Sequence, residues 1–199
     1  DGDGRIDQYG FGAQASNIHK DAIFFFFPLI WSQGGSVEED GHATFNTPEI
    51  RNALQLYVDL VHKYEAAPSS MGTWDKEGAF DAFANGLVAM TLNLTALHPV
   101  AIERLGEETV GIAKYPVKNQ EDTPFTYVET FGFVMSKDAK NKDAAWEFVK
   151  HMGANETLYE AAYYYGTAPS RKSALDNPIY KSTPLLEFIS EYSVEAGHP

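Results

Sequence analysis

The first seven residues carry the clearest arrangement of metal-binding groups in this sequence. Carboxylates alternate with glycines, and Ile6 follows two residues after the second glycine, a spacing typical of the middle of a calcium-binding loop. Asp1 and Asp3 would bind the ion through their carboxylates, and Arg5 through its carbonyl. Asp7 continues the alternation of carboxylates and is a fourth candidate ligand. The first acidic ligand would precede this segment, and Gly10 stands where a bidentate glutamate is expected. The segment therefore predicts either a structural Ca²⁺ site or a solvated acidic turn.

Side chains that could catalyse a reaction are not grouped in a recognised spacing. The six histidines are scattered, and the zinc protease, nucleophile-elbow and phosphate-loop motifs are all missing from the sequence. The acidic run Glu38-Glu39-Asp40 precedes Gly41, which indicates a solvated turn. Cysteine is absent, so thiol catalysis, zinc thiolate sites and disulfides are excluded. Recognised catalytic motifs are therefore missing from the sequence.

Composition narrows the class of partner. The chain has 199 residues, of which 44% are hydrophobic and 14% aromatic, so it can bury one large core or two modest ones. Its net charge is −13 and no stripe of Lys or Arg is present, which argues against nucleic acid and anionic membranes as partners. The longest apolar runs, 22–31 and 87–97, fall short of the roughly 20 residues that span a bilayer. We expect no transmembrane segment.

Helices and strands are predicted to alternate. Thr47 before Pro48 predicts a helix over 48–64, and Asn85-Gly86 ends a second helix over 75–84. A buried strand over 87–92 follows. Further predictions are a helix over 96–105, strands over 110–115 and 125–135, and helices over 142–152, 155–165 and 184–192. In the helix predicted over 155–165, Asn155 would be the N-cap and Tyr165 would lie in the core. This alternation predicts βαβ units and a largely parallel sheet.

Three patterns occur in a fixed order: F-P-L-I-W-S-Q-G-G at 27–35, F-N-T-P-E-I-R-N-A-L-Q-L-Y-V-D-L at 45–60, and A-F-D-A-F-A-N-G-L-V-A-M at 79–90. They are followed by T-P-F-T-Y-V-E-T-F-G-F at 123–133 and D-A-A-W-E-F-V at 143–149. In this order the sequence resembles the extracellular solute-binding proteins of ABC importers, the family that includes maltose-binding proteins.

The resemblance implies an α/β fold of the type II periplasmic-binding-protein kind, in which two lobes close around a ligand. Residues 1–122 correspond to the second lobe, and 123–174 to the interlobe crossing with a returning part of the first lobe. Residues 175–199 would re-enter the second lobe. The N-terminal part of the first lobe and the closing helices have no counterpart in this chain. We therefore expect Trp146 and Phe148 to need cover from the missing lobe.

The resemblance also nominates aromatic ligand contacts. Phe24 and Phe27 precede Pro28 in a segment that faces the cleft, and Trp31 lies in the adjoining turn. Aromatic faces bind sugar rings by apolar stacking. The alternative is that the phenylalanine run fills a core. In an extended segment, at most two of the four phenylalanines could face one cleft.

Polar contacts are expected at five further positions. Asn93 and Thr95 lie in a segment, 93–96, where many relatives have asparagine, glycine, a variable residue and a tryptophan. Here Leu94 replaces the glycine and the tryptophan is absent. The alternative role of Asn93 and Thr95 is a helix cap and a strand end. Glu129 and Thr130 precede the crossing, where Glu129 could instead form a salt bridge to the missing lobe. Tyr163 is the fifth position, in a run of three tyrosines.

The function implied is that of a receptor, not an enzyme, which captures a carbohydrate, expected to be an oligosaccharide, and delivers it to the permease of an ABC importer. The resemblance implies a monomer without a required cofactor, in the periplasm or lipid-anchored on the outer face of the membrane. A cysteine-free chain suits such a compartment. The alternative is a carbohydrate-active enzyme, for which Glu129 is the one acid placed at the cleft.

Overall fold

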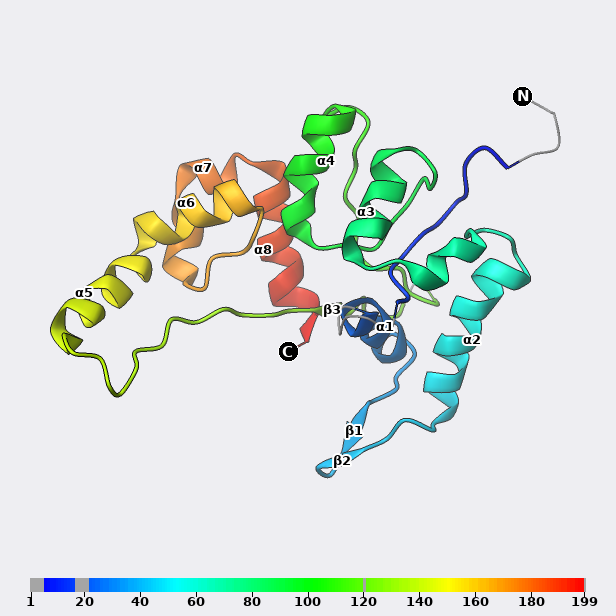
Figure 1. The fold of residues 1–199 in the computed structure, drawn as a ribbon, viewed down its shortest axis with the longest axis horizontal. Coiled ribbons are helices and arrows are strands. Elements are labelled where there is room, and N and C mark those ends of the chain that lie inside the picture. The colour runs from blue at the N-terminus through cyan, green and yellow to red at the C-terminus, as the bar shows by residue number, and fades with distance from the viewer. Residues whose placement is uncertain (1–5, 17–21, 120, 199) are drawn as a thin grey trace. The chain divides into compact units, whose positions relative to one another are not determined.

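The structure is a computed structural model that describes residues 6–16, 22–119 and 121–198 (Figure 1). The chain divides into two compact units, the first formed by residues up to Tyr127 together with His198, and the second by residues 128–197. Within the described ranges, no helix is long and apolar enough to cross a membrane. The fold is of the α/β periplasmic-binding-protein type, as the structural comparisons given below establish.

The first unit contains a parallel pair of extended segments. Tyr9 bridges to Val88 and Gly12 bridges to Thr91, both in parallel orientation. The Gly12 N–H donates to the carbonyl of Met90 at 2.9 Å. The predicted strand over 87–92 is therefore present as bridges. Since the two segments run in parallel, the residues that follow Gly12 and Thr91 leave from the same edge.

The phenylalanine run belongs to a helix, α1 (Ala22–Trp31), with Pro28 inside it. The prediction that this segment is extended was wrong. Nine of the ten residues of α1 are apolar and are not proline, and a helix that is apolar on all sides can be buried. Leu29 and Ile30 pack against Ile50 and Ala53 of α2 (Pro48–His62). The N-cap of α2 is Thr47, as predicted, and its hydroxyl accepts from the Ile50 N–H at 3.4 Å.

Two glycines let α1 and α2 come close together. Gly34 has φ +77°, a left-handed conformation that favours glycine. At Gly35 a Cβ would lie 2.7 Å from Ile30 Cγ2 and 2.7 Å from Glu49 Cβ, so no larger residue fits without displacement. The hairpin β1 (Glu38–Glu39) and β2 (His42–Ala43) follows, and Asp40 and Gly41 at its turn both have positive φ. The acidic run thus lies in an exposed turn.

The rest of the first unit contains a helix, α3 (Lys76–Ala84), capped by Asp75, and a second, α4 (His98–Leu105). Both were predicted, although the second begins as a short 3₁₀ turn, η2 (Thr95–Leu97). The other elements are η1 (Ser69–Thr73) and β3 (Thr126–Tyr127). The strand predicted over 110–115 is wrong, because no segment of the described chain forms a ladder with it.

The second unit is helical, with a small core of Ala162, Tyr180 and Leu186. Its elements are α5 (Lys142–Met152), α6 (Asn155–Tyr165), η3 (Lys172–Asp176), α7 (Pro178–Lys181) and α8 (Pro184–Ala196), and β4 (Gly197–His198) follows. The predicted helices over 142–152 and 155–165 are confirmed, and the last predicted helix is longer than expected.

Two details of α6 differ from the prediction. Ala154 is the N-cap, and Asn155 is the first helical residue, with its Oδ1 accepting from the Ser173 hydroxyl at 3.0 Å. Tyr165 is 68% exposed and not part of the core. The reason is that the inward side of this turn is occupied by the buried Ala162 and by Gly166, which ends the helix in a left-handed conformation.

The strand predicted over 125–135 is regular only in β3. The residues that follow have no regular structure, and the side chains of Phe131 and Val134 are 91% and 93% exposed. On α5, Trp146 and Phe148 are also more than half exposed. An apolar face of this kind is unusual for a solvated surface, and cover by a missing lobe stays a prediction.

Candidate ligand-binding site

Four aromatic side chains gather where α1 and β3 lie side by side (Figure 1). The aromatic cluster consists of Phe24, Phe27, Trp31 and Tyr127. Its three members on α1 are spaced by three and four residues, which places them on one face of a helix. A helix therefore brings together all three nominated aromatic residues, which an extended segment could not.

Tyr127 was not predicted from the sequence, and it links the other rings. Its ring stacks on Phe24 with centroids 4.7 Å apart and an interplanar angle of 30°. It also lies nearly parallel to Trp31, at 6.5 Å and 7°, while Phe27 meets Trp31 edge-on at 5.9 Å. The signal in the sequence was an aromatic residue within T-P-F-T-Y-V-E-T-F-G-F, the segment matched to the interlobe crossing.

Burial differs among these rings. Trp31 is buried, with 7% of its surface exposed, and Phe27 also packs against the core that contains Leu29 and Ile30. Phe24, Phe27 and Tyr127 are half-buried. The core interpretation of the phenylalanine run thus holds for Phe25, which is buried, while the half-buried rings retain surface that a sugar face can stack on.

Asn93 lies just beyond the carboxyl end of the second extended segment, and its amide is partly engaged. Its Nδ2 donates to the carbonyl of Lys76 at 3.1 Å, and its Oδ1 accepts from the Leu94 N–H at 2.9 Å. One amide hydrogen and one oxygen lone pair remain for another partner. Thr95 is half-buried and begins η2.

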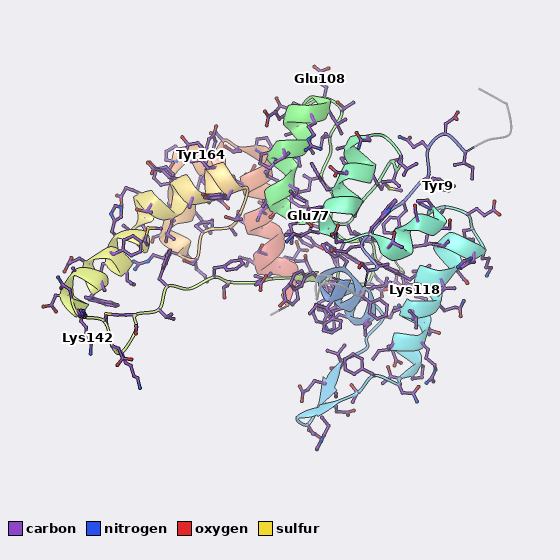
Figure 2. The ribbon with its side chains drawn as sticks, in the orientation of Figure 1. Tyr9, Glu77, Glu108, Lys118, Lys142 and Tyr164 are labelled. Carbon is purple, nitrogen blue, oxygen red and sulfur yellow. The ribbon has the colours of Figure 1, made fainter. Side chains whose placement is uncertain are left out.

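The remaining predicted polar contacts belong to the second unit. Glu129 and Thr130 are exposed in the irregular segment after β3. Tyr163 is 50% exposed on α6 and meets Tyr164 edge-on at 5.6 Å. A shallow hollow of about 300 Å³ is lined by Tyr159, Glu160, Tyr163 and Tyr164. Figure 2 shows Tyr164 on α6. These residues can supply hydroxyl and carboxylate groups.

The predicted calcium ligands Asp1, Asp3 and Arg5 lie outside the described residues, and Asp7 is exposed. Within the described ranges, no three His, Asp or Glu side chains gather in a way that could hold a metal ion. Partial burial lowers the pKa of His98, and its Nδ1 has no hydrogen-bond partner within the described part of the chain.

The family described as bacterial extracellular solute-binding protein matches residues 6–187. The chain belongs to this family. A putative binding protein of Brucella abortus is 26% identical over 142 residues, which are 71% of this chain and 34% of that protein. This solute-binding chain is thus aligned with only about a third of that relative's length.

Two solved structures of solute-binding proteins have the same fold. The maltose/maltodextrin-binding domain MalE from Bdellovibrio bacteriovorus, bound to maltotriose, has a TM-score of 0.80 at 22% identity over 100% of this chain and 51% of that one. An ABC transporter solute-binding protein from Agrobacterium radiobacter, in complex with ribitol, has a TM-score of 0.73 at 26% identity over 95% and 47%. The chain spans about half the length of both.

Proposed function

We propose that this chain is part of an extracytoplasmic receptor that captures a carbohydrate and delivers it to an ABC importer. Membership of the extracellular solute-binding family supports the compartment and the class of function. The similar structures with maltotriose and ribitol support a polyhydroxylated ligand, and the second of them is described as part of an ABC transporter.

The observation that carries the proposal is the aromatic cluster in a chain of this family. Rings from α1 and β3 stack within 4.7 to 6.5 Å of one another, and Phe24 and Tyr127 keep part of their surface exposed. Sugar rings present apolar C–H faces that stack on aromatic rings. We propose polar contacts from Asn93, Thr95, Glu129, Thr130 and Tyr163, in line with their expected places in the family.

The mechanism we propose is closure of two lobes around the ligand. A ligand that contacts both lobes stabilises the closed state because it binds that state with higher affinity. The receptor would act as a monomer, either free in the periplasm or anchored by a lipid. A structural Ca²⁺ at Asp1, Asp3, Arg5 and Asp7 is a further part of the proposal, tested by melting the full-length protein with chelator and with millimolar calcium.

Isothermal titration of the full-length protein against maltose, maltotriose, longer oligosaccharides and ribitol tests the function. We expect stoichiometric binding to at least one of them, with chromatography finding the sugar unchanged. The three tryptophans of this chain include Trp31, so a change in intrinsic fluorescence should accompany binding. Turnover of the sugar would contradict the receptor proposal and favour the enzyme alternative, and absence of binding across the panel would contradict a carbohydrate ligand.

A further inference from the structure

Gln14 is a buried polar residue that the fold leaves without partners. Only 1% of its surface is exposed, and neither Nε2 nor Oε1 has a hydrogen-bond partner among the residues that the structure describes. A buried amide without partners destabilises the folded state by roughly 1 to 3 kcal/mol. An apolar residue of the same length, such as methionine, would fit this position without that penalty. The amide therefore requires an explanation other than packing.

The register of the parallel pair places Gln14 at a particular edge. Tyr9 pairs with Val88 and Gly12 with Thr91, so Gln14 and Asn93 each stand two residues beyond the last bridge. Both leave the carboxyl end of their segment. In open α/β sheets, ligands bind in the crevice outside the carboxyl ends of the strands.

Hydrogen bonds hold these two segments to the same short stretch of chain. The N–H groups of Ala15 and Ser16 donate to the carbonyl of Trp74 at 3.1 and 2.9 Å. The Asn93 amide donates to the carbonyl of Lys76, two residues further on, at 3.1 Å. Gln14 and Asn93 are thus both fixed near the beginning of α3, and α1, whose first turn carries Phe24, follows the segment of Gln14 along the chain.

We propose that the side-chain amide of Gln14 belongs to the ligand-binding site and hydrogen-bonds hydroxyl groups of the carbohydrate. This inference rests on the proposed function. A sugar hydroxyl both donates and accepts, which matches an amide whose donor and acceptor atoms are both unpaired. Because Gln14 is covered, the side chains over it must move aside when the ligand enters. The ligand then supplies partners to the buried amide, which increases affinity.

Gln14→Met tests the proposal, because it keeps the length of the side chain and removes both polar atoms. Gln8→Met is the matched control, since Gln8 precedes the same extended segment at its other end, is exposed, and donates to the carbonyl of Gly86 at 2.9 Å. The probe is whichever of maltose, maltotriose and ribitol the unmodified full-length protein binds most tightly. Affinity is measured by titration and the free energy of unfolding by denaturant.

We expect Gln14→Met to weaken binding roughly three- to tenfold, as for loss of one hydrogen bond, while the protein becomes no less stable. The control should bind as the unmodified protein does. Analogues of the sugar that lack single hydroxyls add a second measurement, because the hydroxyl that meets Gln14 should contribute to affinity only when the glutamine is present.

Unchanged affinity of a folded Gln14→Met variant would overturn the proposal, whatever its stability. If that variant does not fold, Gln14→Leu replaces it, because leucine is shorter and also removes both polar atoms, and unchanged affinity there would overturn the proposal equally. Failure of the unmodified protein to bind any sugar of the panel is a different result, since it would overturn the proposed function and this inference with it.

Discussion

The rings of Trp31 and Tyr127 are parallel to within 7°, with their centroids 6.5 Å apart, although one lies in α1 and the other in β3. This contact joins a helix near the beginning of the chain to a strand far along it. Since Tyr127 also stacks on Phe24, one tyrosine fixes two rings of the same helical face. The geometry of the aromatic cluster therefore depends on where β3 lies.

Phe24→Ala should weaken carbohydrate binding more than it weakens the fold. Phe24 is half-buried and stacks on Tyr127, so its removal takes away a ring of the cluster and part of its exposed surface. We expect a loss of about tenfold or more in affinity, comparable to one aromatic stacking contact. Titration and denaturant unfolding of the full-length variant measure the two effects separately.

Phe26→Ala is the matched control for that change. Phe26 meets Tyr57 edge-on at 5.9 Å on the core side of the same helix. Its removal should lower the free energy of unfolding by roughly 2 to 4 kcal/mol and leave affinity unchanged in the folded protein. Loss of stability with unchanged affinity in Phe24→Ala as well would mean that the aromatic run is core.

Local signals in the sequence predicted helices well and strands poorly. Thr47 with Pro48, and Gly86 after α3, act within one turn of chain, and these helices are present at nearly the predicted bounds. A strand needs a neighbour from elsewhere in the sequence. The segments 110–115 and 128–135 have strand-like composition, yet neither is regular in the described structure.

The same distinction applies to the candidate site. The resemblance nominated Phe24, Phe27 and Trp31, but their common face became visible only once α1 was seen to be a helix. Tyr127 was missed because its ring stacks on a residue far away in the sequence. Gln14 was missed because the sequence does not show that a buried amide has no hydrogen-bond partner among the described residues. Neither a stacking partner nor an unpaired buried amide can be predicted from the neighbouring residues in the sequence.

Tyr57→Phe should stabilise the protein. The Tyr57 hydroxyl is buried and has no hydrogen-bond partner in the described ranges, and burial raises the pKa of this phenol above its ordinary value. Removing the hydroxyl keeps the ring in contact with Phe26 and removes an unpaired polar group, so we expect a gain of about 1 kcal/mol in the free energy of unfolding. Denaturant unfolding measures this change.

Tyr115→Phe makes the same chemical change in the same core and should have the opposite sign. The Tyr115 hydroxyl donates to the carbonyl of Phe25 in α1, so its loss should destabilise the protein by about 1 kcal/mol. If Tyr57→Phe also destabilises the protein, the hydroxyl of Tyr57 has a hydrogen-bond partner in solution.

His98 should make the protein less stable as the pH falls below about 6.5, the ordinary pKa of histidine. Burial lowers the pKa of His98 in the folded state, so the unfolded chain binds a proton at higher pH than the folded chain does. Stability is retained above 6.5 and falls as the pH approaches the lower folded pKa. Unfolding at pH 8 and pH 5 should show a smaller decrease for His98→Gln than for the unmodified protein, and equal decreases would contradict this origin.

Gly12→Ala should destabilise the first unit, because the residue lies where the paired segments meet a tryptophan. A Cβ at this position would lie 2.8 Å from Cζ3 of Trp74 and 2.9 Å from Cγ1 of Val88, closer than such atoms pack. Overpacking of this kind lowers the free energy of unfolding by about 1 to 3 kcal/mol. Gly111→Ala is the control, since a Cβ there meets nothing within 4 Å. If both variants unfold at the same denaturant concentration as the unmodified protein, the close approach of Trp74 and Val88 to Gly12 does not exist in solution.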